Sequence, residues 1–95
     1  MLQKTIPPSL RGIPNVGPAT ALDLQRLGFG RLEELRGKDP DQLYELLCRI
    51  DGVKHDICVR DVFAALIDQA AGRPAKPWWH YSRRRLAQVR ARRRA

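Results

Sequence analysis

Residues 12–24 constrain this 95-residue chain more than any other stretch, because they require a sharp turn that leads directly into a helix. Asn15 and Gly17 both tolerate the left-handed backbone conformations that tight turns need. Pro18 has the fixed φ that suits the first position of a helix. The sequence therefore predicts a tight turn followed by a helix over about residues 18–27.

The first amides of that helix have no partner within it, and they point outward at the positive end of the helix dipole. Such an arrangement suits a phosphate group. We therefore expect the turn to hold a phosphate of duplex DNA, without reading the bases. The alternative is that the turn only joins two helices. The expected contacts are the amides of Val16, Gly17 and Ala19, the Thr20 hydroxyl, and the side chains of Lys4, Arg11 and Asn15.

The turn also resembles a known motif, the helix-hairpin-helix of DNA-binding proteins. The usual form of that motif is Ile-Pro-Gly-Val-Gly-Pro, followed by a spaced Ala and Leu. Asn15 replaces the first glycine of the motif, and its side chain can either crowd a phosphate or bond to it. The matching residues here are Ile13, Pro14, Val16, Gly17, Pro18, Ala21 and Leu24.

A wider pattern covers about residues 8–85 and is similar to the small bacterial "pathogenicity locus" helix-hairpin-helix family. It runs from Leu10, through a second turn near two cysteines, to Pro77 and the two tryptophans that follow. The resemblance implies a helix-hairpin-helix fold and carries no established activity.

Helical periodicity dominates the remaining sequence, and no run of alternating β-branched residues predicts a strand. Short helices are predicted over about residues 30–38 and 40–49, and the longest one over about residues 54–71. We expect an all-α, compact bundle of about five short helices, built from one clear and one degenerate helix-hairpin-helix unit. The expected apolar positions of the last two helices are Leu43, Leu46, Leu47 and Ile50, and then Ile57, Val59, Val62, Phe63, Leu66, Ile67 and Ala70.

The formal charge of +8 is distributed unevenly along the chain. Residues 1–31 carry four basic and one acidic side chain, and residues 32–72 carry five basic and nine acidic ones. Residues 73–95 carry nine basic side chains and no acidic one. We therefore divide the chain into a helix-hairpin-helix domain at 1–75 and a basic tail at 76–95, and we expect a polyanionic partner.

Seven arginines of the tail would repel one another, so we expect this segment to be frayed or disordered until an acidic surface neutralises it. The tail then binds nucleic acid, either DNA or RNA, or it only improves solubility. The expected tail contacts to DNA are Arg83, Arg84, Arg85 and Arg90.

Two tryptophans, Trp78 and Trp79, stand where the domain meets the tail. They either stack on exposed bases or fold back to cover the small core, and we favour the second interpretation because an indole buries a large apolar area. His80 is interpreted as a surface or capping residue.

A zinc site is conceivable at Cys48, His55 and Cys58, but it needs a fourth ligand, which Asp51 or His80 would have to supply. Free thiols and a capping histidine explain the same residues, so we expect no metal and no cofactor. No catalytic arrangement or nucleotide-binding loop is present, so we expect no enzymatic activity.

The sequence as a whole favours a non-enzymatic, cytoplasmic module that binds DNA independently of base sequence and does not cross a membrane. The alternative is a protein-interaction adaptor in a DNA repair, recombination or uptake pathway. Its docking face would be the acidic middle segment, which includes Glu33, Glu34, Asp39, Asp41 and Glu45.

Overall fold

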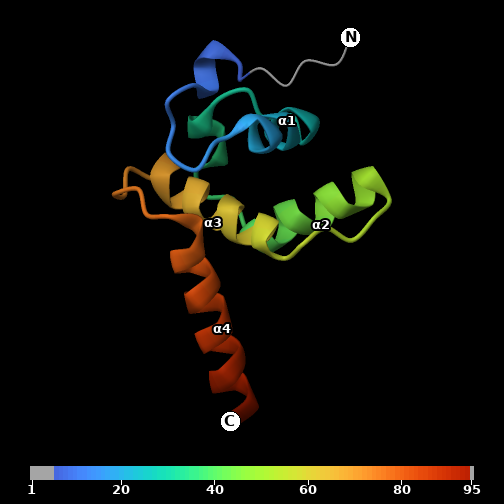
Figure 1. The fold of residues 1–95 in the computed structure, drawn as a ribbon, viewed down its shortest axis with the longest axis vertical. Coiled ribbons are helices and arrows are strands. Elements are labelled where there is room, and N and C mark those ends of the chain that lie inside the picture. The colour runs from blue at the N-terminus through green and yellow to red at the C-terminus, as the bar shows by residue number, and fades with distance from the viewer. Residues whose placement is uncertain (1–5, 95) are drawn as a thin grey trace.

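The computed structural model describes residues 6–94, and the chain is all-helical over that range (Figure 1). The all-α class is therefore confirmed, with four α-helices and two short 3₁₀-helices in place of about five short helices. The elements are η1 (Pro8–Leu10), α1 (Pro18–Arg26), η2 (Leu32–Leu35), α2 (Pro40–Asp51), α3 (Cys58–Ala70) and α4 (Trp78–Arg94).

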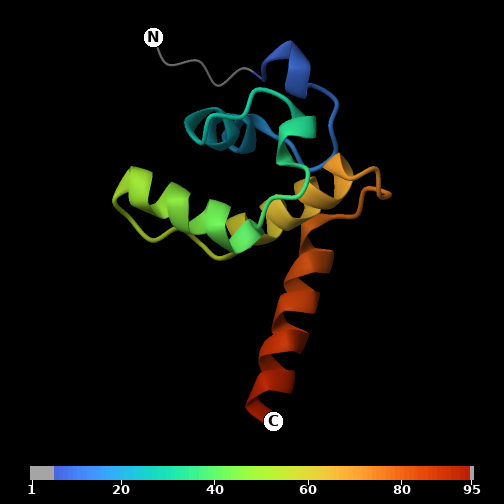
Figure 2. The same ribbon diagram turned by 180° about the vertical axis from the view of Figure 1, so that it is seen from behind.

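The elements η1 to α3 form a globular body, and α4 projects from it as an arm (Figures 1 and 2). The molecule is therefore elongated, with extents of 49, 33 and 20 Å. Helix α3 is the central element, since η2, α2 and α4 all pack against it. The main core lies between α1, η2, α2 and α3, and its buried residues are Leu10, Ala21, Leu24, Leu35, Leu43, Tyr44, Leu47, Phe63 and Leu66.

Helix α1 forms as predicted and ends one residue early, at Arg26. Gly28 ends the turn that follows with a φ of 93°, a left-handed conformation that glycine adopts without strain. The Phe29 amide then donates to the Leu24 carbonyl at 2.8 Å, which returns the chain to the core.

Helix α2 begins at Pro40, as predicted, because the Asp39 carboxylate accepts a hydrogen bond from the Asp41 amide at 2.8 Å. Its predicted apolar stripe is wrong in two places, since Leu46 and Ile50 are 40% and 46% exposed. The buried side of α2 is centred on Leu43, Tyr44 and Leu47, so these two side chains lie at its solvent-facing edge.

Helix α3 begins at Cys58, four residues later than predicted, and Ile57 is 40% exposed at its start. The Asp56 carboxylate accepts a hydrogen bond from the Cys58 amide at 2.8 Å, and this capping contact explains the later start. The longest helix is therefore α4, with 17 residues, and not α3.

The basic tail is helical through Arg94 and not frayed, which corrects the prediction for this segment. Tyr81 explains the difference, because it is only 6% exposed and packs with Ala64 and Ala65 of α3. Trp78 and Trp79 are 38% and 47% exposed and belong to neither core cluster, so they cover the body only in part.

The predicted boundary between a domain at 1–75 and a tail at 76–95 stays a prediction. A connector of residues 71–77 joins α3 to α4. None of the helices within residues 6–94 combines the length and the apolar composition that a membrane-spanning segment requires.

Candidate nucleic-acid interface

The turn of residues 12–17, here called the first turn, adopts the sharp geometry that the sequence predicts. Gly12 and Asn15 have φ values of 72° and 69°, both in the left-handed region. Gly17 instead has an extended backbone, with φ −100° and ψ −178°, and it is the N-cap of α1. The Val16 amide donates to the Ile13 carbonyl at 3.1 Å within the turn. The prediction that this amide is free to contact a phosphate is therefore wrong.

Three amides at the start of α1 remain free. Within the part of the chain that the structure describes, Gly17, Ala19 and Thr20 donate no backbone hydrogen bond to the protein. A Cβ atom placed on Gly17 would meet nothing within 4 Å, so the approach to these amides is open. The positive end of α1 can therefore accept an anion such as a phosphate.

The Asn15 side chain faces the protein and not the solvent-exposed amides. Its amide nitrogen donates to Gln69 Oε1 at 2.7 Å and to the Lys76 carbonyl at 2.8 Å. Its oxygen accepts from the Trp78 amide at 3.1 Å. Asn15 therefore joins the first turn to the end of α3 and the start of α4, and a phosphate contact is left to the backbone.

Gln69 completes this junction by donating from its amide nitrogen to the Pro14 carbonyl at 3.0 Å. The roles of Gln69 and of the connector leave no pattern in the local sequence, because the bonded residues are 54 to 63 positions apart. The only available signal was an asparagine at the usual glycine position of the motif.

Arg11, the predicted flanking residue, is exposed and donates from Nε to the Ile6 carbonyl at 2.9 Å. Its guanidinium group is therefore partly used to hold the lead-in segment. The other predicted flanking residue, Lys4, lies outside the described residues.

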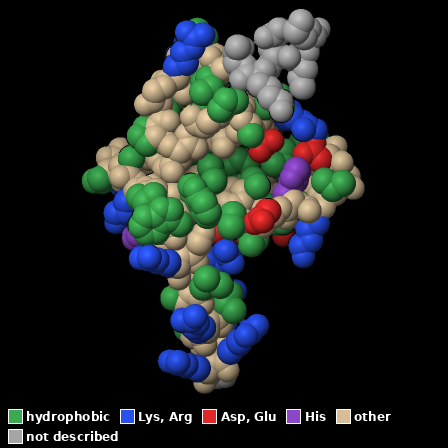
Figure 3. Space-filling view, in the orientation of Figure 1, with side chains coloured by type: hydrophobic (Ala, Val, Ile, Leu, Met, Phe, Trp, Pro, Cys, Tyr) green, Lys and Arg blue, Asp and Glu red, His purple; other side chains and the backbone are tan. Residues whose placement is uncertain are grey.

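The arm carries arginines in two different environments. Arg83, Arg90 and Arg94 are exposed, and their spacings of seven and four residues place them on one face of α4. We call these three residues the outer arginines. Figure 3 shows Lys and Arg side chains along the arm, whereas the acidic side chains visible in this view lie on the body.

Arg85 lies on the opposite side of α4 and contacts Asp61 of α3, which is fully buried. The Arg85 Nη2 and Nε atoms lie 3.0 and 3.1 Å from the Asp61 carboxylate oxygens. Ser82 donates to the same carboxylate at 2.6 Å, and Arg60 donates at 3.3 Å. We call these four residues the Asp61 cluster.

The electrostatics of this cluster favour an ionised Asp61. Burial raises the pKa of Asp61, but hydrogen bonds from Arg85 and Ser82 and the Arg85 charge outweigh it. The net result is an Asp61 pKa below its ordinary value. Arg85 is thus paired within the protein and is not positioned as the freely available DNA contact that the sequence predicted.

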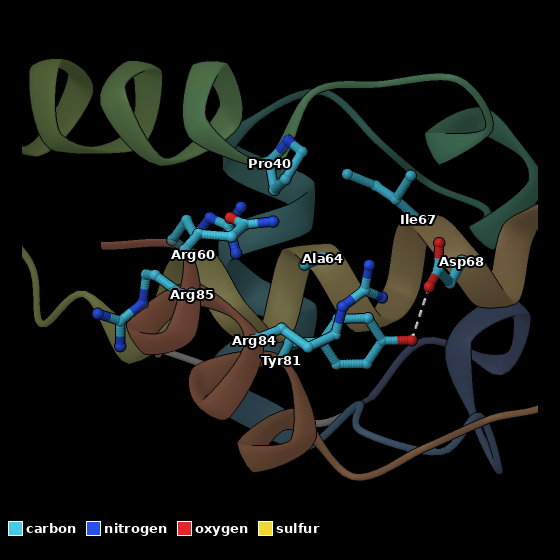
Figure 4. Close-up of a pocket in the computed structure, with 9 residues that line it drawn as sticks. Pro40, Arg60, Ala64, Ile67, Asp68, Tyr81, Arg84 and Arg85 are labelled. Carbon is cyan, nitrogen blue, oxygen red and sulfur yellow. Dashed lines mark hydrogen bonds between the residues drawn. The ribbon is translucent and has the colours of Figure 1, made fainter. Parts of the chain in front are cut away.

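Arg84 lines a small cavity of about 150 Å³ between α3, α4 and the start of α2 (Figure 4). Arg60 and Arg85 lie on one side of it, and Tyr81 and Asp68 lie on the other. The Tyr81 hydroxyl donates to Asp68 at 2.8 Å. Burial, together with this hydrogen bond, raises the pKa of Tyr81 to about 12.

The second turn, residues 52–57, has a different chemistry from the first. The Asp51 carboxylate at its start pairs with Arg26 of α1, and it lies 2.6 Å from the His55 Nε2 atom. The Asp56 carboxylate occupies the Cys58 amide at the start of α3. A phosphate would therefore meet two carboxylates at this turn.

Cys48 and Cys58 are free thiols. The Cys48 sulfur accepts a hydrogen bond from the His55 amide at 3.4 Å, while the His55 ring pairs with Asp51. Among residues 6–94, no three His, Cys, Asp or Glu side chains are grouped to hold a metal ion. His80, the other suggested ligand, packs edge-on against the Tyr81 ring with centroids 5.1 Å apart.

Comparison with known proteins identifies the family. The model of the Cdd1 family, described as Pathogenicity locus, matches residues 3–87. The chain is also 40% identical over 79 residues to the mitomycin resistance protein McrB of Streptomyces lavendulae, a match that covers 81% of this chain and 75% of that protein. No solved structure gives a significant match. The resemblance to the pathogenicity locus proteins is thereby confirmed, and the chain belongs to the Cdd1, or Pathogenicity locus, family.

Proposed function

We propose that this protein is a non-enzymatic module that binds the phosphate backbone of duplex DNA independently of base sequence. The first turn and α1 act as the hairpin and second helix of a helix-hairpin-helix unit. The start of α1 contacts one phosphate, and the outer arginines contact others. A sequence-independent partner follows from this contact set, because backbone contacts position a protein without reading bases.

In this proposal, the start of α1 determines where a phosphate binds. The free amides of Gly17, Ala19 and Thr20 lie at the positive end of the helix dipole, and the space beside Gly17 is open. Thr20 is half-buried on the same turn of helix, and its hydroxyl adds a further donor.

The arm supplies most of the attraction. Its 17 residues span about 25 Å, so the outer arginines can face several phosphates of one duplex. No acidic side chain follows Asp68 in the sequence, so nothing on α4 opposes a polyanion.

The single observation that carries the proposal is the junction at Asn15. Its side chain bonds to the Lys76 carbonyl and to the Trp78 amide, which begins α4. The first turn, which leads into α1, and the start of the basic arm, 63 residues apart in sequence, therefore lie side by side. This arrangement supports a single duplex contacting both.

The second turn supports the fold in this proposal and does not contact DNA. At the start of α3 the Asp56 carboxylate already fills the place that a phosphate would take. Like charges at this distance repel, so the α2–turn–α3 unit is the degenerate copy of the motif.

Gly17→Val tests the role of the first turn. The extended backbone of Gly17 accepts valine, and the added side chain stands in open space beside the free amides. We expect roughly tenfold weaker binding to a blunt duplex, measured by fluorescence anisotropy, because a charged hydrogen bond contributes about 1.5–3 kcal/mol. Unfolding in urea should show unchanged stability.

Gly30→Val is the matched control. Gly30 is the only other glycine with φ outside the left-handed region, and its Cβ would meet only Glu34 Oε1, at 3.9 Å. Equal affinities of the two variants would show that the first turn only joins helices.

The relative from Streptomyces lavendulae is named for mitomycin resistance. If this chain shares that role through DNA binding, Gly17→Val should abolish the resistance and Gly30→Val should preserve it.

A protein-interaction adaptor is the second candidate, favoured by an exposed apolar strip at the end of α2. Its members are Leu46, Ile50 and Val53, which are 40%, 46% and 57% exposed. The acidic docking face fits less well, because Asp39 caps α2 and Asp41 pairs with Arg60. A partner that stays bound at 1 M salt and is lost in Ile50→Lys would favour this candidate, since an apolar contact resists screening.

A further inference from the structure

The two tryptophans are exposed at the one place where the first turn meets the arm. Burying an indole removes on the order of 150–250 Å² of surface from water, so small proteins gain by covering it. Here Tyr81 takes the buried position, and Trp78 and Trp79 keep 38% and 47% of their surface exposed. These rings are the largest apolar side chains left outside the core.

One backbone contact and one ring contact position this part of α4. The Trp78 amide donates to Asn15, which positions the pair directly beside the first turn. The Arg83 guanidinium lies over the Trp79 ring, 4.7 Å from its centroid. This cation–π contact orients the indole and covers one of its two faces. Trp79 is thus 47% exposed and has a positive charge beside its ring.

The charge around the rings selects the kind of ligand. From Arg73 to the end of the chain there are nine basic side chains and no acidic one. An apolar protein surface would leave the exposed arginines of the arm without partners, whereas a nucleotide offers a flat base for the ring and a phosphate for the arginine. A continuous duplex does not offer that flat surface, because its bases are stacked on one another.

We propose that Trp79, oriented by Arg83 and assisted by Trp78, stacks on an unpaired base, so that the protein prefers DNA in which a duplex adjoins unpaired nucleotides. This inference rests on the proposed DNA binding and names the preferred form of DNA. The first turn and the outer arginines hold the duplex, and the exposed indole contacts the first unpaired base beside it.

Binding to two DNA ligands of equal phosphate number tests the preference. One is a continuous duplex, and the other is a duplex with a short single-stranded gap. We expect the wild-type protein to bind the gapped ligand about tenfold more tightly, in line with one stacked base. Trp79→Ala should lose that difference, and Trp79→Phe should keep most of it because the ring remains.

Leu86→Ala is the matched control. Leu86 is 48% exposed, and its position seven residues after Trp79 places it on the same side of α4, but it has no ring. It should keep the wild-type preference. Equal wild-type affinities for the two ligands, or a preference that survives Trp79→Ala, would overturn the inference while leaving DNA binding intact. Failure to bind either ligand would instead overturn the proposed function.

Fluorescence gives an independent measurement. In Trp78→Phe the only indole is Trp79, so its emission reports on that ring alone. Stacking predicts strong quenching by the gapped ligand and little quenching by the continuous duplex at equal saturation. Equal quenching by both ligands would contradict stacking on an unpaired base.

Discussion

The two sides of α4 carry the same residue type in opposite roles. On the side facing α3, Arg85 is 21% exposed and pairs with the buried carboxylate of Asp61. On the other side, the outer arginines are exposed to solvent. The same guanidinium group therefore contributes to folding at Arg85 and faces solvent at Arg90 and Arg94, while Arg83 also lies over the Trp79 ring.

This difference shows why a count of charges overstates the available binding surface. The tail has seven arginines after Ser82, but Arg85 is neutralised within the protein. Truncation at Ser82 would remove Arg85 and leave Asp61 without its main partner. Substitutions on single faces of α4 therefore separate folding from binding better than deletion does.

Arg85→Ala should have the largest effect on stability. It leaves a buried carboxylate with only Ser82 and Arg60, so we expect the free energy of unfolding to fall by about 3 kcal/mol, measured by urea denaturation. Arg90→Ala on the exposed side is the control and should change stability by less than about 0.5 kcal/mol. Similar losses in both variants would contradict the distinction between the two sides.

Replacing the outer arginines together should act on binding and not on folding. In the variant Arg83→Gln, Arg90→Gln, Arg94→Gln, three phosphate contacts are lost. The slope of log affinity against log salt should then become shallower by about 2.7, which corresponds to roughly fortyfold between 50 and 200 mM salt. The measurement is a salt titration of duplex binding, and an unchanged slope would show that these residues do not face the DNA.

The smallest predicted effect is the pH dependence of the free energy of unfolding that arises from Asp61, and this dependence is absent near neutral pH. Its folded pKa lies below the ordinary value, so its contribution is complete above about pH 4 and is lost as pH falls through the folded pKa. The difference in unfolding free energy between the wild type and Asp61→Asn should therefore be constant from pH 6 to 8 and should shrink below about pH 4. Urea denaturation at several pH values measures it, and a constant difference down to pH 2 would contradict an ionised buried Asp61.

Much of the fold could be predicted from short segments of sequence. The turn before Pro18 and the starts of α1 at Pro18 and α2 at Pro40 all depend on residues within one or two turns of the site. Local backbone preferences decide these features, so the sequence predicted them closely. The start of α3 was missed because Asp56, within the second turn, accepts a hydrogen bond from the Cys58 amide.

The candidate site was predicted less completely. The open end of α1 follows from its motif, but the Val16 amide is used within the turn. The inward direction of Asn15 depends on Gln69 and on the connector, which no local pattern reveals. The exposure of the tryptophans depends on which face of α4 meets α3.

Local sequence is sufficient for the helical class, the sharp first turn and the basic character of the arm, because each arises from neighbouring residues. Tertiary structure alone decides that α4 is an ordered arm, that Arg85 is paired, and that the arm starts beside the first turn. The physical reason is distance along the chain: the deciding bonds join Asp61 to Arg85, 24 residues away, and Asn15 to Trp78, 63 residues away. The rotational phase of α4 then determines which arginines and rings remain available to a partner.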